Sequence, residues 1–238
     1  QDISAWNVGK VTTMQSMFRN AYAFNGDLSS WVTSSVTDMS QMFDQASVFD
    51  QAISAWDVSK VTTMSQMFNQ ASVFDQAISA WDVSKVTTMS QMFRQARNFN
   101  RDLGSWDVGS VTTMYEMFAD GNSWDISYGY YWNDDSIEQF AFDGDISSWD
   151  VSKVTDFGGM FYQSDSFNGD ISSWDVSNGT NFFAMFAQAD SFNQDIGQWQ
   201  LSSVGVCEDW YPNQGYDNGG YCMSGWSSLS NMFQGADA

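Results

Sequence analysis

Histidine is absent from this 238-residue chain, and several other reactive residues are scarce. Without histidine, the chain cannot build a Ser-His-Asp or Cys-His catalytic arrangement or a histidine-based metal site. Glutamate occurs only as Glu116, Glu138 and Glu208, so a carboxylate-pair hydrolase would have to rely mostly on aspartate. We therefore expect no enzymatic activity.

Basic residues and long apolar runs are also lacking. Eight Lys and Arg against 29 Asp and Glu give a formal net charge of −21, which disfavours binding to nucleic acid or to an anionic bilayer. An acidic balance suits a soluble extracellular protein or a cation-binding surface. No apolar run is long enough to span a membrane. No initiator Met or signal peptide is present, so Gln1 begins either a mature chain or an excerpt of a longer one.

Cysteine and proline are nearly absent. Cys207, Cys222 and the only proline, Pro212, fall in one irregular stretch. Two cysteines in one such excursion predict a disulfide and an oxidising compartment, with a pair of free thiols as the alternative. Closing this loop would stabilise the fold by roughly 3 kcal/mol in the chain-entropy model.

The chain is rich in one 25-residue repeat. Residues 51–75 and 76–100 begin with the same eighteen residues, and tryptophan recurs at a fixed spacing. The tryptophans of the repeat are Trp6, Trp31, Trp56, Trp81, Trp106, Trp149, Trp174 and Trp199. A period of this length indicates a stacked repeat architecture, in which no unit buries its own apolar face alone.

The apolar spacing changes once within each unit. From Ile53 to Val58 the Trp-x-Val core alternates like a short strand. From Val61 to Ala71 the apolar residues follow a helical spacing, which predicts a helix of about two to three turns. We therefore expect one domain, residues 1–238: a right-handed α/β solenoid of eight strand–helix coils, with one parallel sheet and helices behind it. Two insertions, residues 119–141 and 205–227, interrupt the period.

Stacking turns each repeat position into a row of side chains. The aspartates that follow tryptophan should form an exposed acidic row, read as a solvated face or as a surface for a cation or a partner: Asp57, Asp82, Asp107, Asp150 and Asp175. The turn residues are weak calcium candidates, because calcium prefers oxygen ligands: Asn25, Asp27, Asp143, Asp145, Asn168 and Asp170. Hydrogen bonding of these side chains to the turn backbone explains them without a metal.

Two further rows have structural interpretations. The methionines at the helical spacing, such as Met64 and Met89, are better explained as core filling than as a copper site. The threonines such as Thr62 precede the predicted helices and should cap them, rather than form an ice-binding array.

The whole repeat, Phe-Asn-x-Asp-Ile-Ser-x-Trp-Asp-Val-Ser-x-Val-Thr-x-Met-x-x-Met-Phe, closely resembles that of the BspA-type surface proteins. These are leucine-rich-repeat proteins of bacteria, mycoplasmas and some microbial eukaryotes. The resemblance covers nearly all the chain outside the insertions. It implies a secreted or surface-displayed protein used in adhesion or surface architecture, and no enzyme.

The remaining features bear on partners. The first insertion gathers aromatic residues that something should cover: Trp124, Tyr128, Tyr130, Tyr131 and Trp132. A contact with a neighbouring subunit, or a minor folded cap, is one interpretation, and a glycan- or protein-binding patch is the other. Asn178 lies in the only Asn-x-Ser/Thr sequence and is a glycosylation candidate.

Two functions remain from these observations. The first is a structural building block whose open ends stack head to tail into a filament. The second is an adhesin that grips a glycan or a host protein through its acidic face or its aromatic loops.

Overall fold

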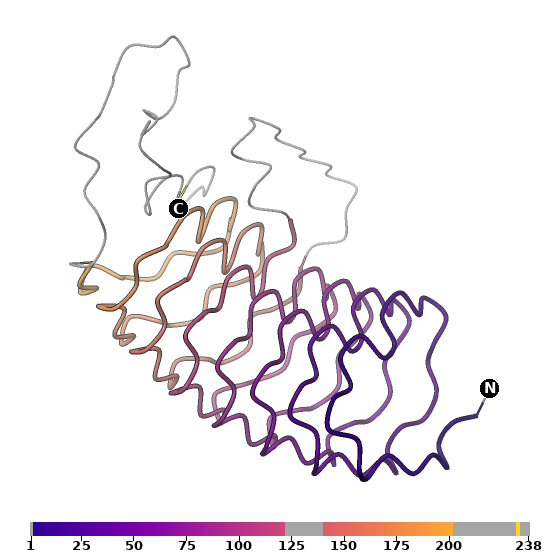
Figure 1. The fold of residues 1–238 in the computed structure, drawn as a ribbon. Helices are drawn as coiled ribbons and strands as arrows, with labels where there is room; N and C mark the ends of the chain where they lie inside the picture. The colour runs from indigo at the N-terminus through magenta and orange to yellow at the C-terminus, as the bar shows by residue number, and fades with distance from the viewer. Residues whose placement is uncertain (1, 122–139, 202–231, 234–238) are drawn as a thin grey trace, which may run out of the picture.

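The structure is a computed structural model that describes residues 2–121, 140–201 and 232–233. The chain winds into a stack of coils with the first coil at one end (Figure 1). We number the coils by their tryptophans: 1–25, 26–50, 51–75, 76–100, 101–143, 144–168, 169–193 and 194–238. Neighbouring coils lie in strict register: the amide of Thr62 donates to the carbonyl of Thr37 at 2.9 Å, and that of Thr155 donates to Thr112 across the first insertion at 2.9 Å.

The predicted α/β solenoid is wrong. The described residues contain no α-helix and no multi-residue strand, so there is neither a parallel sheet nor a layer of helices behind it. Neighbouring coils share only isolated parallel bridges, each one residue long. The bridge residues form one row along the stack: Thr13, Asp38, Thr63, Thr88, Thr113, Asp156 and Asn181.

Each coil is instead a succession of tight turns. In coil 3, the amide of Trp56 donates to the carbonyl of Ile53, and the amide of Val61 donates to that of Val58, at 3.1 and 2.8 Å. The segment expected to be a strand is therefore two turns, each closed by a bond to the third residue back. The alternating apolar residues predicted the buried face correctly, because a chain of turns can also present every second or third side chain to one side.

The segment expected to be helical divides its amides between two partners. The amides of Met64, Gln66 and Phe68 donate to carbonyls of coil 4, whereas the intervening amides of Met67 and Asn69 donate within their own coil. A helix would satisfy all of these groups internally. Here the neighbouring coil supplies half of the partners, so stacking replaces the helix.

Two positions in most coils carry a left-handed backbone, which no α-helix permits. In coil 3 they are Gln66 and Gln70, with φ of 59° and 57°. A left-handed conformation costs a residue with a side chain about 1–2 kcal/mol, so the bonds between coils must offset this strain. At the first of the two positions coil 6 has Gly159, also at φ 59°, where the cost disappears.

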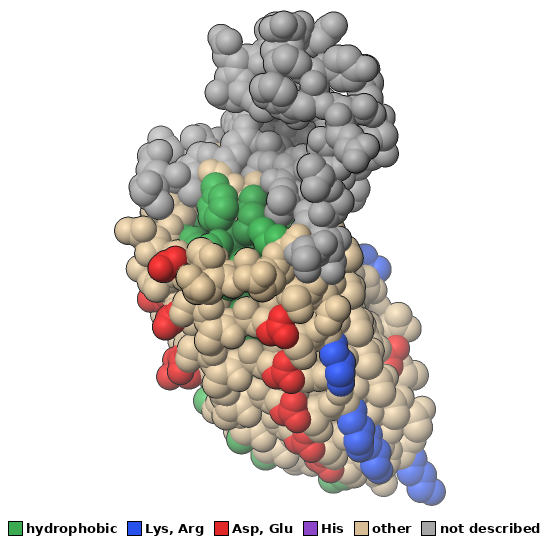
Figure 2. All heavy atoms as spheres, turned by 90° about the vertical axis from the view of Figure 1, so that its left-hand side faces the viewer, with side chains coloured by type: hydrophobic (Ala, Val, Ile, Leu, Met, Phe, Trp, Pro, Cys, Tyr) green, Lys and Arg blue, Asp and Glu red, His purple; other side chains and the backbone are tan. Residues whose placement is uncertain are grey.

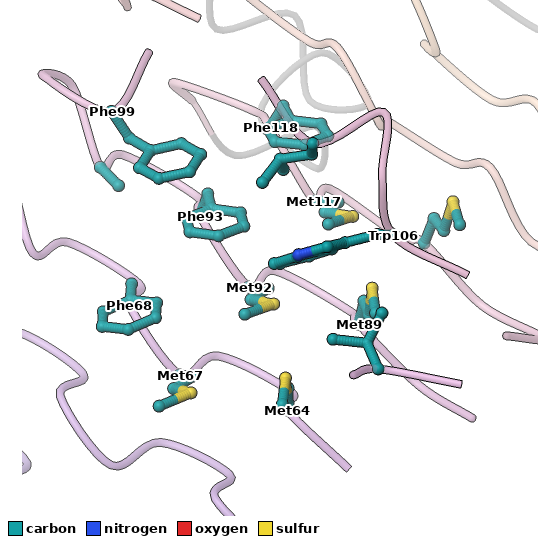
Figure 3. Close-up of a cluster of buried hydrophobic side chains, with 14 of the residues drawn as sticks. Met64, Met67, Phe68, Met89, Met92, Phe93, Phe99, Trp106, Met117 and Phe118 are labelled. Atoms are coloured by element: carbon teal, nitrogen blue, oxygen red, sulfur yellow. The ribbon is translucent and has the colours of Figure 1, made fainter. Parts of the chain in front are cut away.

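The predicted core residues are buried even though the backbone differs. Met64, Met67 and Phe68 are fully buried, as are their counterparts in the neighbouring coils (Figure 3). Rings from successive coils lie nearly parallel in columns: Phe43 and Phe68 have centroids 5.6 Å apart, and Trp31 and Trp56 6.5 Å. The methionine row is core filling, as the spacing indicated.

The tryptophans also make a polar bond between coils. The indole Nε1–H of Trp56 donates to the carbonyl of Leu28 in the preceding coil at 3.1 Å, and that of Trp81 donates to Ile53 at 3.2 Å. The same bond recurs at every tryptophan of the repeat from Trp31 to Trp199. Each ring therefore fixes the register of two coils while it fills the core.

Candidate interaction surfaces

The acidic row after the tryptophans lies on the surface, as predicted. Asp57, Asp82 and Asp107 are all exposed, and columns of acidic and basic side chains run along the stack (Figure 2). Oδ1 of Asp57 accepts hydrogen bonds from the hydroxyl and the amide of Ser59, at 2.7 and 3.0 Å. These bonds, helped by Lys60, lower the pKa of the Asp57 carboxyl. Asp57 therefore stays ionised while one of its carboxylate oxygens holds its own turn.

The calcium candidates are engaged in backbone hydrogen bonds. Oδ1 of Asn25 accepts the amide of Asp50 in the next coil at 3.0 Å, and Oδ1 of Asp143 accepts the amide of Asn168 at 2.9 Å. Oδ1 of Asn168 accepts the amide of Asn193 at 2.9 Å. This part of the turn row joins neighbouring coils.

The other three candidates close turns within their own coils. Asp27, Asp145 and Asp170 each accept the amide of the serine two residues later. Among the described residues, no group of three or more His, Cys, Asp or Glu is placed to hold a metal ion. The hydrogen bonds account for the recurring residues of the turn without a cation, and calcium binding stays a prediction.

The threonine row does not cap helices, because the described residues contain none. The hydroxyl of Thr62 donates to the carbonyl of Thr37 in the preceding coil at 3.2 Å, and that of Thr87 donates to Thr62 at 3.1 Å. The hydroxyl thus repeats the bond made by its own backbone amide. The prediction of a cap was wrong because the neighbouring coil, and not a helix start, offers the nearest polar partner.

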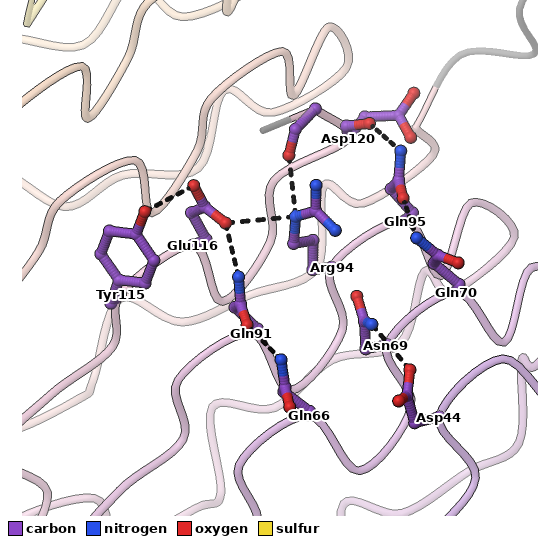
Figure 4. A network of polar contacts seen from close by, with 11 residues as sticks. Asp44, Gln66, Asn69, Gln70, Gln91, Arg94, Gln95, Tyr115, Glu116 and Asp120 are labelled. Atoms are coloured by element: carbon purple, nitrogen blue, oxygen red, sulfur yellow. Dashed lines mark hydrogen bonds and ion pairs between the residues drawn. The ribbon is translucent and has the colours of Figure 1, made fainter. Parts of the chain in front are cut away.

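A glutamine ladder escaped the sequence analysis. The side-chain amide of Gln41 donates to that of Gln66. Gln66 in turn donates to Gln91 (Figure 4). A second ladder joins Gln70 to Gln95 at 2.8 Å. The 25-residue recurrence of glutamine was the available signal, but on a helix these positions read as a solvent face.

The first ladder ends at a buried carboxylate. Gln91 donates to Oε2 of Glu116 at 2.7 Å, the hydroxyl of Tyr115 donates to Oε1 at 2.8 Å, and Nε of Arg94 lies 3.1 Å from Oε2. The Glu116 side chain is fully buried, and that of Arg94 is 13% exposed. Arg94 also donates to the carbonyl of Gly121 at 2.9 Å. Arg94 therefore joins the buried carboxylate to the start of the first insertion.

A second arginine of coil 4, Arg97, binds the chain at both ends of the first insertion. Nε of Arg97 donates to Oδ1 of Asp120 at 3.0 Å, and the carbonyl of Arg97 accepts the amide of Ala141, where the chain returns. Burial raises the pKa of Asp120, and the bond to Arg97 opposes this. Nearby, burial and the charges of Asp190 and Asp120 raise the pKa of Asp165 to about 6.

Among the described residues, the first coil and the last coil each expose an aromatic ring. Trp6 is 51% exposed, whereas Trp31 and Trp56 are 4% and 3% exposed. At the other end, Phe233 is 48% exposed and stacks on the buried Phe186, with ring centroids 5.6 Å apart. Inside the stack these positions are covered by the neighbouring coil.

The remaining predicted residues are placed as follows. Asn178 is exposed, and its Nδ2 donates to the carbonyl of Ser152 at 2.8 Å. Both cysteines and the aromatic residues of the first insertion lie outside the described residues: Cys207, Cys222, Trp124, Tyr128, Tyr130, Tyr131 and Trp132. The described part contains no helix that is long and apolar enough to cross a membrane.

The stacked coils and their shared hydrogen-bond rows define a tandem-repeat protein. The chain belongs to the family described as "Mycoplasma protein of unknown function, DUF285", which matches residues 1–62, 49–141 and 137–226. The three matches follow one another along the chain, in agreement with the repeat. No curated protein matches the chain.

Proposed function

We propose that the protein is a non-catalytic building block of an extracellular surface, and that its coil stacks join head to tail into a filament. We also propose that the chain is one of the BspA-type surface proteins that its repeat resembles. Display outside the cell agrees with the net charge of −21 and with a family of tandem repeats. Building such a surface requires a rigid unit with reproducible junctions.

The observation that carries the proposal is that the junctions between coils are interchangeable. The contact between coils 2 and 3 uses the same indole bond and ring stacks as the contact between coils 3 and 4. Rows of polar side chains also bind the neighbouring coil at a repeated separation of 25 residues. A face that accepts one coil of this repeat therefore accepts any other coil of the same pattern.

Sedimentation velocity and negative-stain electron microscopy of residues 1–238 test the proposal. We expect rods that lengthen as the concentration rises, because a head-to-tail contact that does not close grows without limit. A monodisperse monomer at high concentration would contradict it.

An adhesin is the second candidate, and the exposed acidic row favours it. Asp57, Asp82 and Asp150 each use Oδ1 for their own turn, and the pKa of each carboxyl is lowered by its serine. An ionised row along a rigid axis suits a cationic protein segment.

Binding of a lysine-rich peptide at two salt concentrations tests this second function. We expect binding that weakens with salt and falls in the triple variant Asp57→Asn, Asp82→Asn, Asp107→Asn. The control is the triple variant Asp27→Asn, Asp145→Asn, Asp170→Asn, which removes the same number of charges from exposed aspartates of the turn row. An equal loss of peptide binding in the control would show that binding depends on the net charge of the protein and not on this row of aspartates.

A further inference from the structure

The few basic residues of the chain fall into two groups. Every arginine forms an ion pair with an acidic side chain of the stack: Arg19 with Asp44, Arg94 with Glu116, Arg97 with Asp120, and Arg101 with Asp75. The lysines of the chain are Lys10, Lys60, Lys85 and Lys153. None of them forms an ion pair with a described residue. Lysine therefore supplies the cationic side chains that the described part of this acidic protein leaves unpaired.

The lysines form a single column beside the acidic row. Each lies three residues after the position that aspartate occupies in that row, and all four are exposed. The two columns run next to each other along the stack (Figure 2). The charges of Lys60 and Lys85 help to lower the pKa of Asp57. The columns therefore lie within electrostatic reach of each other without forming an ion pair. We call the two columns together the charged side of the stack.

The charged side is complementary to a second copy of itself. When two copies face each other across a twofold axis parallel to the stack, the axis exchanges the two columns. Each acidic row then meets the lysine column of the other copy. A twofold axis that runs across the stack in the plane of contact would instead place aspartate opposite aspartate, and like charges directly opposite repel. Charge therefore selects the arrangement in which the two stacks are parallel.

The order of charges along the stack fits this arrangement. A twofold axis parallel to the stack brings equal coils opposite each other, so a coil with both charges forms two reciprocal pairs. Coils 3, 4 and 6 have both charges: Asp57 with Lys60, Asp82 with Lys85, and Asp150 with Lys153. In coil 2 both positions are uncharged, as Val32 and Ser35. No lysine is placed opposite another lysine.

We propose that the charged side binds the charged side of a second copy, with the two stacks parallel and equal coils facing each other. Lys60 of each copy pairs with Asp57 of the other, and coils 4 and 6 repeat this contact. Single exposed ion pairs contribute little, so the dimer depends on their repetition along a rigid stack. Salt screens the remaining negative charges beyond about 8 Å. The contact uses a side of the stack and does not require the proposed head-to-tail contact.

Reciprocal charge changes test the contact. The lysine variant is Lys60→Glu, Lys85→Glu, Lys153→Glu. The aspartate variant is Asp57→Lys, Asp82→Lys, Asp150→Lys. Each variant alone places like charges opposite each other and should lower the association constant about tenfold or more. An equimolar mixture should restore association, because opposite charges face each other again. Sedimentation velocity measures the association, and negative-stain microscopy distinguishes paired rods from single ones.

The control variant is Asp27→Lys, Asp145→Lys, Asp170→Lys. It changes the net charge as much as the aspartate variant does, and it also removes three bonds from aspartate to a turn amide. It should pair at least as well as the native protein, because the turn row lies outside the proposed contact. Equal weakening in the control, or a mixture that pairs no better than its components, overturns the proposal.

Carbodiimide coupling locates the contact in the native protein. The reagent activates a carboxylate, and a lysine amine displaces it to form an amide while the carbodiimide becomes a urea. In a mixture of isotope-labelled and unlabelled protein, we expect coupled peptides in which Lys60 comes from one copy and Asp57 from the other.

Coupling within single copies alone overturns the pairing, as does binding of a lysine-rich peptide to the acidic row of a protein that does not pair. Single rods that still lengthen with concentration would then leave the head-to-tail proposal standing.

Discussion

At the scale of the residue, the tryptophan of each repeat serves two purposes. Its ring lies in a column with the rings of neighbouring coils, and its indole N–H satisfies a carbonyl of the preceding coil. A buried carbonyl without a partner costs about 1–3 kcal/mol. Phenylalanine could fill part of the space but could not make the bond, which explains why tryptophan recurs here.

Trp81→Phe should therefore lower the free energy of unfolding by about 2–4 kcal/mol, through the unsatisfied carbonyl of Ile53 and the space left by the smaller ring. Trp6→Phe is the control, since that ring is half exposed and should change stability by less than about 0.5 kcal/mol. Denaturant unfolding at a concentration without assembly measures both. Equal effects would show that the indole bond contributes nothing.

At the scale of the element, the left-handed glutamines distinguish this coil from a helix. In an exposed helix, alanine is preferred to glycine by about 1 kcal/mol. At Gln66, with φ of 59°, the order should reverse, because glycine adopts this conformation freely.

We expect Gln66→Ala to be about 1 kcal/mol less stable than Gln66→Gly, since both lose the ladder and only alanine keeps the strain. At the neighbouring Ser65, whose φ is not positive, alanine should be the more stable of the two. Thermal unfolding of the four variants measures this. Alanine favoured at both positions would instead indicate a helix.

The junction between coils 4 and 5 depends on a buried ion pair. Arg94→Leu leaves the Glu116 carboxylate without its cation, and we expect a loss of about 3 kcal/mol in unfolding free energy. The control is Arg101→Leu, which breaks an exposed pair with Asp75 whose side chains are 47% and 32% exposed. Such a pair contributes about 0–1 kcal/mol. A similar small loss for both variants would contradict the role of burial.

At the scale of the whole molecule, the acidic charge predicts a stack that is more stable below neutral pH. The pKa of Asp165 is raised from 3.8 to about 6 by burial and by Asp190 and Asp120. The folded state therefore binds a proton before the unfolded state does, so stability rises as pH falls from 7 toward 4. Carboxyls with lowered pKa, such as that of Asp82, lose their stabilising effect below about pH 4.

Asp165→Asn should remove part of the rise in melting temperature between pH 7 and pH 5. Because Asp165 is partly exposed, a discounted contribution of about 1 kcal/mol corresponds to about 2–4 °C. Asp82→Asn should keep the full rise. A rise of the same size in all three proteins would assign it to net charge alone.

The sequence by itself determined the repeat, its register and its buried side. The 25-residue recurrence of tryptophan, and the apolar positions such as Met64 and Phe68, predicted which side chains are buried. Hydrophobic burial follows apolar spacing whatever the backbone does, so this part of the prediction did not depend on secondary structure. The exposed aspartates followed from the same spacing.

Only the tertiary structure decided the backbone. The spacing from Val61 to Ala71 fits a helix, but a parallel neighbour at every coil offers carbonyls to alternate amides, and the chain turns to meet them. The glutamine ladders exist only because the next coil repeats the same residue at the same height. Local periodicity cannot reveal such partners, because they lie one coil away in the sequence and in direct contact in space.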